Sequence, residues 1–171
     1  MLKIIGAIFI VCATTWAGFG FSKRLSDRTK QLRHFRSSLQ TLEAEIMYSH
    51  APLGEAARRI AAQLSEPISL QYQSFSEKLT EANATVSSAW EQSLRELWPK
   101  TALQKSEYEI LQQFGENLGK HDRMTEQKQI MLTLSHLERE EENARDKQKN
   151  YEKMAKSLGL LTGILFIILL M

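Results

Sequence analysis

Cysteine, proline, glycine and histidine are all sparse in this sequence of 171 residues. A single cysteine excludes an internal disulfide and any cysteine-ligated zinc or iron–sulfur cluster. The net charge of +2 provides no general field for nucleic acid, so we expect no nucleic-acid partner. Only three prolines and eight glycines interrupt the chain, and no alternating pattern of apolar residues is present. These absences favour helices throughout.

Motifs of known catalytic chemistry are also missing, including phosphate-binding loops, dinucleotide fingerprints and HExxH zinc sites. His136 and Glu140 lie one helical turn apart, but two ligands do not make a metal site. Glu43 and Glu45 are two residues apart on a predicted helix and point in different directions. We therefore expect no catalytic residues, no metal site and no cofactor, and attention turns to binding surfaces.

Apolar residues concentrate at the two ends of the chain. Ile4–Phe21 is an uncharged run of eighteen residues, about 27 Å as a helix, close to the roughly 30 Å hydrocarbon core. Leu158–Met171 is a shorter run of fourteen, about 21 Å, so whether it fully crosses stays open. The pattern predicts membrane helices at 1–21 and 158–171 around a polar domain at 22–157. A cleaved signal peptide is the alternative for the first run, although no small-x-small cleavage site follows it cleanly.

Basic residues flank both apolar runs on the side of the polar domain. They are Lys23, Arg24, Arg28, Lys30, Arg33 and Arg36 after the first run, and Arg145, Lys147, Lys149, Lys153 and Lys156 before the second. This bias predicts a cytoplasmic domain with both termini on the opposite side of the membrane.

Small residues occur four apart in both apolar runs, a spacing that lets membrane helices approach closely. Ala13 and Ala17 in the first run, with Gly159 and Gly163 in the second, are candidates for helix packing. Pairing within the chain and pairing with another membrane protein are both open.

The polar domain has helical periodicity throughout, with apolar residues repeating at three and four. We expect six helices, which begin at the membrane, at Pro52, at Pro67, at Asn83 or Thr85, at a Ser106-x-x-Glu109 capping box, and at Asp122. The predicted fold is all-α: a six-helix cytoplasmic antiparallel bundle on two long helices that continue into the N- and C-terminal membrane spans.

The first and last helices both enter the membrane, so they are expected to run antiparallel. Aligning their membrane ends places Arg33 near Asp146 and Arg36 near Glu142. The acidic block Glu138, Glu140, Glu141 and Glu142 is interpreted as a solvated helix face with weak local ion pairs.

The end of the bundle farthest from the membrane is the candidate partner-binding surface. There the first helix turns into the second and the last helix begins, which gathers negative charge suited to a basic partner. The candidate residues are Glu43, Glu45, Tyr48, Glu55, Asp122 and Arg123. The alternative is an ordinary helix–turn–helix whose N-terminal glutamate is favoured by the helix dipole.

Two spaced patterns between the apolar runs carry a resemblance to a known family. They are Leu39-x-x-Leu42-x-x-Glu45-Ile46-x-Tyr48-x-x-x-Pro52-Leu53-x-Glu55-Ala56 and Phe114-Gly115-x-x-Leu118-Gly119-x-x-Asp122. Together with the apolar ends, they resemble stage III sporulation protein AB, a family of endospore-forming bacteria. Its cytoplasmic part is similar to the helical domain of the inner-membrane platform proteins of type II secretion and type IV pilus machines.

The resemblance implies a non-enzymatic platform in the transenvelope complex between mother cell and forespore. The protein would lie in the mother-cell membrane around the forespore, with its bundle in the mother-cell cytoplasm. The implied partners are a secretion-type ATPase (stage III sporulation protein AA), other stage III sporulation A membrane proteins, and the lipid bilayer. It would dock the ATPase and couple it to ring or channel subunits. The alternative is a passive membrane scaffold that nucleates the channel without contacting a motor.

Overall fold

The computed structural model of the chain describes the backbone of residues 2–49, 51–82, 84–120 and 122–170. It describes the side chains of residues 20, 22–49, 51–82, 84–120, 122–155 and 157.

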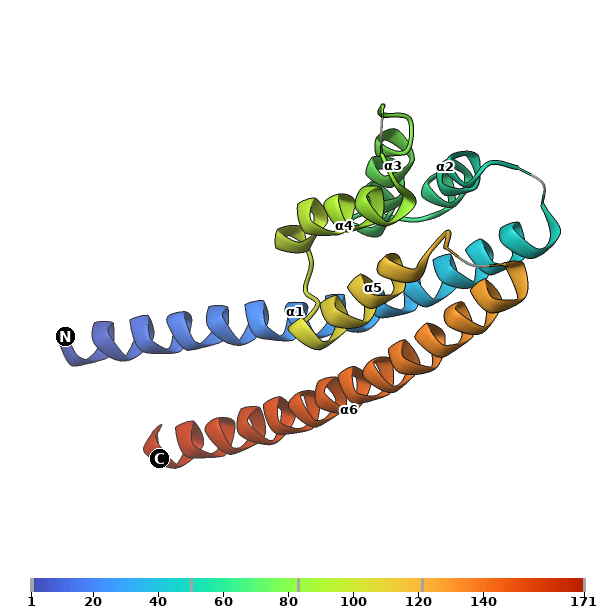
Figure 1. The fold of residues 1–171 in the computed structure, drawn as a ribbon. Helices are drawn as coiled ribbons and strands as arrows, with labels where there is room; N and C mark the ends of the chain where they lie inside the picture. Colours follow the sequence, from blue (N-terminus) through green and yellow to red (C-terminus); the bar gives the residue numbers. More distant parts are fainter. Residues whose placement is uncertain (1, 50, 83, 121, 171) are drawn as a thin grey trace.

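All secondary structure in these residues is helical, which confirms the predicted all-α class. The elements are α1 (Leu2–Tyr48), α2 (Leu53–Gln63), α3 (Ile68–Lys78), α4 (Val86–Leu97), a short 3-10 turn η1 (Trp98–Lys100), α5 (Lys105–Asn117) and α6 (Arg123–Leu170). The two long helices, α1 and α6, run antiparallel, with both termini at the same end of the molecule (Figure 1). The short helices α2, α3 and α4 pack on one side of this pair, and α5 lies between them and the long helices (Figure 1).

The predicted membrane spans at 1–21 and 158–171 fall largely on residues whose side chains are not described. Among the residues whose side chains are described, no helix is both long and apolar enough to cross a membrane. The candidate packing residues Ala13, Ala17, Gly159 and Gly163 also lie outside the described side chains.

Three helix starts follow the sequence prediction. Pro52 and Pro67 directly precede α2 and α3, because proline lacks the N–H that the first helical turn leaves unpaired. Thr85 caps α4: its hydroxyl accepts a hydrogen bond from the Ser88 backbone N–H at 3.1 Å. Ser88 Oγ in turn accepts one from the Thr85 N–H at 3.0 Å, which completes a capping box.

The predicted start of α5 is wrong by two residues. The capping box is formed by Gln104 and Glu107, not by Ser106 and Glu109. The Glu107 carboxylate accepts a hydrogen bond from the Gln104 backbone N–H while its side chain is fully buried. Burial against α1, described below, selects Glu107 over Glu109, whose side chain is exposed in solvent.

Trp90 on α4 is the centre of the core that joins the short helices. Its fully buried ring makes edge-to-face contacts with Tyr72 and Phe75 on α3 and with Phe114 on α5, at centroid distances of 5.8, 5.2 and 5.1 Å. The indole N–H donates a hydrogen bond to the Leu111 carbonyl at 2.8 Å, so its polar atom is satisfied. One buried side chain therefore ties three helices together.

A second part of the core runs along the contact between α1 and α6. Its buried apolar residues repeat at three and four on each helix, as the sequence predicts. They are Leu32, Phe35, Leu39 and Leu42 on α1, with Ile130, Leu134, Leu137 and Ala144 on α6.

Gly115 on α5 gives the first testable prediction, because the ring of Trp90 occupies the space beside its Cα. A Cβ at this position would lie 1.9 Å from Trp90 Cδ1, and the buried indole has no room to withdraw. We expect Gly115→Ala to lower the free energy of unfolding by about 2–3 kcal/mol, measured by urea unfolding followed by circular dichroism.

Gly54→Ala is the matched control, because its added Cβ would meet its nearest neighbour at an ordinary 3.8 Å. Alanine also favours the helical backbone by about 0.5–1 kcal/mol, so stability should be unchanged or slightly higher. Equal losses in the two variants would contradict the proposed clash with Trp90.

Candidate partner-binding surfaces

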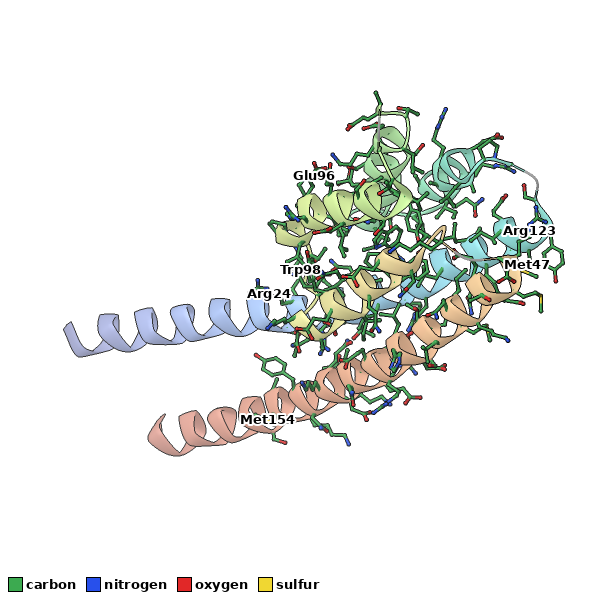
Figure 2. The ribbon with its side chains drawn as sticks, viewed as in Figure 1. Arg24, Met47, Glu96, Trp98, Arg123 and Met154 are labelled. Atoms are coloured by element: carbon green, nitrogen blue, oxygen red, sulfur yellow. The ribbon has the colours of Figure 1, made fainter. Side chains whose placement is uncertain are left out.

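The predicted surface lies at the end of the bundle where α1 stops and α6 begins. Figure 2 shows Met47 of α1 and Arg123 of α6 at this same end. A hollow of about 230 Å³ lies here, which we call the distal hollow. Its walls are formed by Glu45, Ile46, Ser49, Ala51, Leu53, Ala56 and Arg123. The fold thus brings two of the predicted residues, Glu45 and Arg123, to one hollow although they lie 78 residues apart in the sequence.

Glu45 is the polar group of the distal hollow with unused capacity for hydrogen bonding. Its Oε1 lies 3.5 Å from Arg59 Nη1, and the other η-nitrogen of Arg59 lies 3.3 Å from Glu55 Oε1. Glu45 Oε2 is buried and has no hydrogen-bond partner among the described residues. A buried carboxylate oxygen without a donor is unfavourable, so this atom favours an incoming hydrogen-bond donor.

The other predicted residues are used in different ways. Glu43 accepts a hydrogen bond from Gln127 Nε2 at 2.7 Å, which ties α1 to α6. Asp122 accepts a hydrogen bond from the Thr125 hydroxyl at 2.7 Å, and this bond lowers the pKa of the Asp122 carboxyl below its usual value. Tyr48 is 83% exposed. Arg59 lies close to both Glu45 and Glu55 and offsets one of their two negative charges, so the negative charge at this end of the bundle is reduced but not removed.

A buried ionic cluster lies elsewhere in the bundle, and the sequence analysis did not predict it. Arg28 on α1 is almost fully buried and binds the fully buried Glu107 of α5 through Nε, at 2.8 Å, and through Nη2. Its Nη2 also lies 3.0 Å from Glu140 Oε2 on α6. The cluster therefore connects three helices, and Glu107 also caps the helix that carries it.

A second cluster surrounds Glu141 on α6, whose side chain is only 3% exposed. Arg36 donates to it at 2.7 Å, Arg145 at 2.9 Å and Arg33 at 3.4 Å. The expected pairing of Arg33 with Asp146 and Arg36 with Glu142 is wrong, because the two helices are offset from the assumed alignment. The interpretation of this acidic run as a solvated face is also wrong for Glu141.

The sequence contains a signal that would have found both clusters. Arg28 stands on the same stripe as Leu32 and Phe35, four and seven residues before them. Glu141 likewise follows Leu134 and Leu137 by seven and four. A charge at a core position of an amphipathic helix indicates a buried ion pair, because an unpaired buried charge is strongly unfavourable.

Comparison with known proteins agrees with the family resemblance. Residues 3–171 match the family described as Stage III sporulation protein AB. The chain belongs to this family. The stage III sporulation protein AB of Bacillus subtilis (strain 168) is 52% identical over 171 residues, which is the whole of both chains. A solved structure of a stage III sporulation protein AB matches with a TM-score of 0.70 and 48% identity, and covers 72% of this chain and 98% of that one. The similarity to platform proteins of secretion and pilus machines stays a prediction.

The buried Arg28 cluster gives a prediction for this stage III sporulation AB chain. Arg28→Met leaves the buried Glu107 without its cation, so we expect a loss of about 3–5 kcal/mol in the free energy of unfolding. Adding Glu107→Gln should recover part of the loss, because glutamine keeps the capping oxygen without the charge. Arg33→Met is the control: its side chain is 62% exposed, and the change should stay below about 1 kcal/mol. Comparable losses for Arg28→Met and Arg33→Met in urea unfolding would be inconsistent with a buried cluster.

Glu141 gives a prediction about pH. Burial alone raises its pKa, but the hydrogen bonds and charges of Arg36, Arg145 and Arg33 together outweigh burial and hold the pKa below the usual 4.5. A carboxyl with a depressed pKa contributes stability above its unfolded pKa, and the contribution disappears as pH falls through the folded pKa. We therefore expect Glu141→Gln to destabilise the protein clearly at pH 7 and progressively less as the pH is lowered below 4.5. Unfolding measured from pH 7 to pH 3 checks this, and a difference that is constant or grows in acid would disprove it.

Proposed function

We propose that this chain is a non-enzymatic platform of the mother cell–forespore transenvelope complex in sporulation. It docks a secretion-type ATPase, stage III sporulation protein AA, and couples that ATPase to membrane ring or channel subunits. Membership of the stage III sporulation protein AB family supports the role in sporulation. The docking step depends on the distal hollow, at the end of the bundle opposite to the two chain termini (Figure 1).

The chemistry of the distal hollow is the observation that carries the docking proposal. Ile46, Leu53 and Ala56 supply apolar walls, and the unpartnered Oε2 of Glu45 supplies a buried acceptor. An arginine or lysine side chain combines an aliphatic stem with a charged donor, and so it matches both features. We therefore propose that the ATPase inserts a basic side chain into the distal hollow beside the exposed Tyr48.

Attachment to the bilayer is the second part of the proposal. It depends on the apolar runs at both ends of the sequence and on the basic residues that follow the first and precede the second. Two such anchors would hold the bundle in the mother-cell cytoplasm, on the membrane that surrounds the forespore. The distal hollow would then face the compartment that contains the ATPase and its nucleotide.

The docking prediction concerns Glu45. We expect Glu45→Gln to weaken binding of the ATPase by about tenfold, since a hydrogen bond to a charged group contributes about 1.5–3 kcal/mol, and Glu45→Lys to abolish it. Co-purification of the ATPase with the detergent-solubilised full chain measures this. Glu55→Gln is the control, because Glu55 also pairs with Arg59 but does not line the hollow. Unchanged binding in Glu45→Lys would place the docking surface elsewhere. Failure to recover the ATPase with the unaltered chain would favour the passive scaffold.

The topology prediction uses cysteine accessibility. In a Cys12→Ala background, Gln92→Cys and Ser157→Cys place single thiols at exposed positions on the bundle. We expect a membrane-impermeant maleimide to label both thiols only after the mother-cell membrane is permeabilised. Labelling in intact cells would place the bundle on the wrong side for a cytoplasmic ATPase.

A further inference from the structure

The outward side of α6 carries large apolar side chains that no part of the described bundle covers. Met124, Met131 and Leu132 are 57%, 54% and 52% exposed. The opposite side of the same helix carries the buried Ile130, Leu134 and Leu137. Lys128 is exposed between Met124 and Met131 at helical spacing, and Arg139 is exposed on the same side two turns after Leu132. We call this surface, formed by Met124, Lys128, Met131, Leu132, Ser135 and Arg139, the outer face of α6.

The position of the outer face agrees with the layout of the fold. The short helices α2, α3 and α4 all lie on the other side of the long pair, so α6 has an open flank (Figure 1). The core of the bundle is complete without these residues, since the side of α6 that faces α1 and α5 is already buried. The exposed methionines and leucine are therefore not required by the fold itself.

The charges of the outer face indicate which kind of partner would fit. Neither Lys128 nor Arg139 forms an ion pair with any residue that the structure describes. The nearby Glu138 is bound to Arg36, at 2.7 Å. The outer face thus presents two cations that pair with no described residue, Lys128 among the apolar side chains and Arg139 at its far end, and it is complementary to carboxylates.

The shape of the outer face indicates the secondary structure of that partner. The face extends from Met124 to Arg139, about 22 Å along α6, which is the length of about four turns of a second helix. Ser135 follows Leu132 by three residues on this face, and its small side chain lets another helix approach; its hydroxyl already donates to the Leu132 carbonyl at 2.7 Å. Methionine side chains are flexible and adapt to the surface of a partner.

We infer that the outer face of α6 binds an acidic amphipathic helix of another protein. Leucine- or isoleucine-type side chains of that helix pack on Met124, Met131 and Leu132, and its carboxylates pair with Lys128 and Arg139. A second copy of this chain fits less well. Two copies attached to one bilayer, as proposed above, have parallel α6 helices, which in register place Lys128 opposite Lys128 and Arg139 opposite Arg139.

The outer face and the distal hollow are separate sites. The hollow is lined by residues of α1, α2 and the segment before α2, and α6 contributes only Arg123. Substitutions in one site therefore leave the other unchanged, and the two proposals can fail independently.

Site-specific photocrosslinking in sporulating cells tests the inference with the full chain. A benzoylphenylalanine at Leu132 should crosslink to a different protein, and mass spectrometry should locate the attachment in a segment with apolar residues at helical spacing and flanking Asp or Glu. The same group at Gln92, which is exposed on α4, should give no such product. The Glu45→Lys variant of the distal hollow should leave the Leu132 product unchanged.

Reversing the charges of Lys128 and Arg139 tests whether the partner is recognised by these charges or is crosslinked only because Leu132 is exposed. Lys128→Glu with Arg139→Glu should reduce the Leu132 product at least tenfold, whereas Lys100→Glu with Lys120→Glu changes the net charge equally and should leave it intact. If the reversed variant unfolds at a lower temperature, Lys128→Gln with Arg139→Gln provides the same test with a smaller reduction. Any of four results overturns the inference. These are no product at Leu132, a product only with lipid or a second copy, attachment to a segment without acidic residues, or a crosslink yield that is the same in the charge-reversed variant as in the unaltered chain.

Discussion

Charges buried along the contact between α1 and α6 determine how these two helices are aligned. Leucine stripes alone allow two helices to slide by one turn with little change in packing. Such a shift would break the bonds from Arg28 to Glu140 and from Arg36 to Glu141, and this loss is unfavourable because Arg28 and Glu141 are buried charges. The distal hollow takes residues from both helices, so its geometry depends on this alignment.

The all-α class and most helix limits follow from local rules that the sequence displays. Proline before α2 and α3, Thr85 before α4 and the positive φ of Gly119 after α5 each act within a few residues. The start of α5 differs from the prediction because Ser106-x-x-Glu109 matches the usual capping-box pattern, whereas Gln104 is not a usual N-cap residue. Only the position of Arg28, far away in the sequence, distinguishes the two.

The sequence likewise predicts which residues of the candidate site lie close together, but not how their side chains pair. Glu45 and Arg123 line the same hollow because the antiparallel arrangement places the end of α1 beside the start of α6. Two contacts could not be predicted: the ion pair of Glu45 with Arg59 and the hydrogen bond from Gln127 to Glu43. Each depends on how side chains of different helices meet, and the spacing of apolar residues does not specify this. The outer face of α6 could not be predicted for a related reason. Methionines and leucines at helical spacing are typical of a buried core, and only the three-dimensional structure shows which apolar side of α6 stays uncovered.

The ionic cluster of Arg28 also marks where α1 leaves the bundle. It joins α1 to α5 and α6, and among the described residues the buried positions of α1 run from Arg28 to Leu42. Contacts along this stretch, and the bond between Gln127 and Glu43 beyond it, hold α1 to α6 at several points. At 1.5 Å per residue, the helix from Arg28 back to Leu2 is about 39 Å long, so Arg28 is the base from which that arm extends.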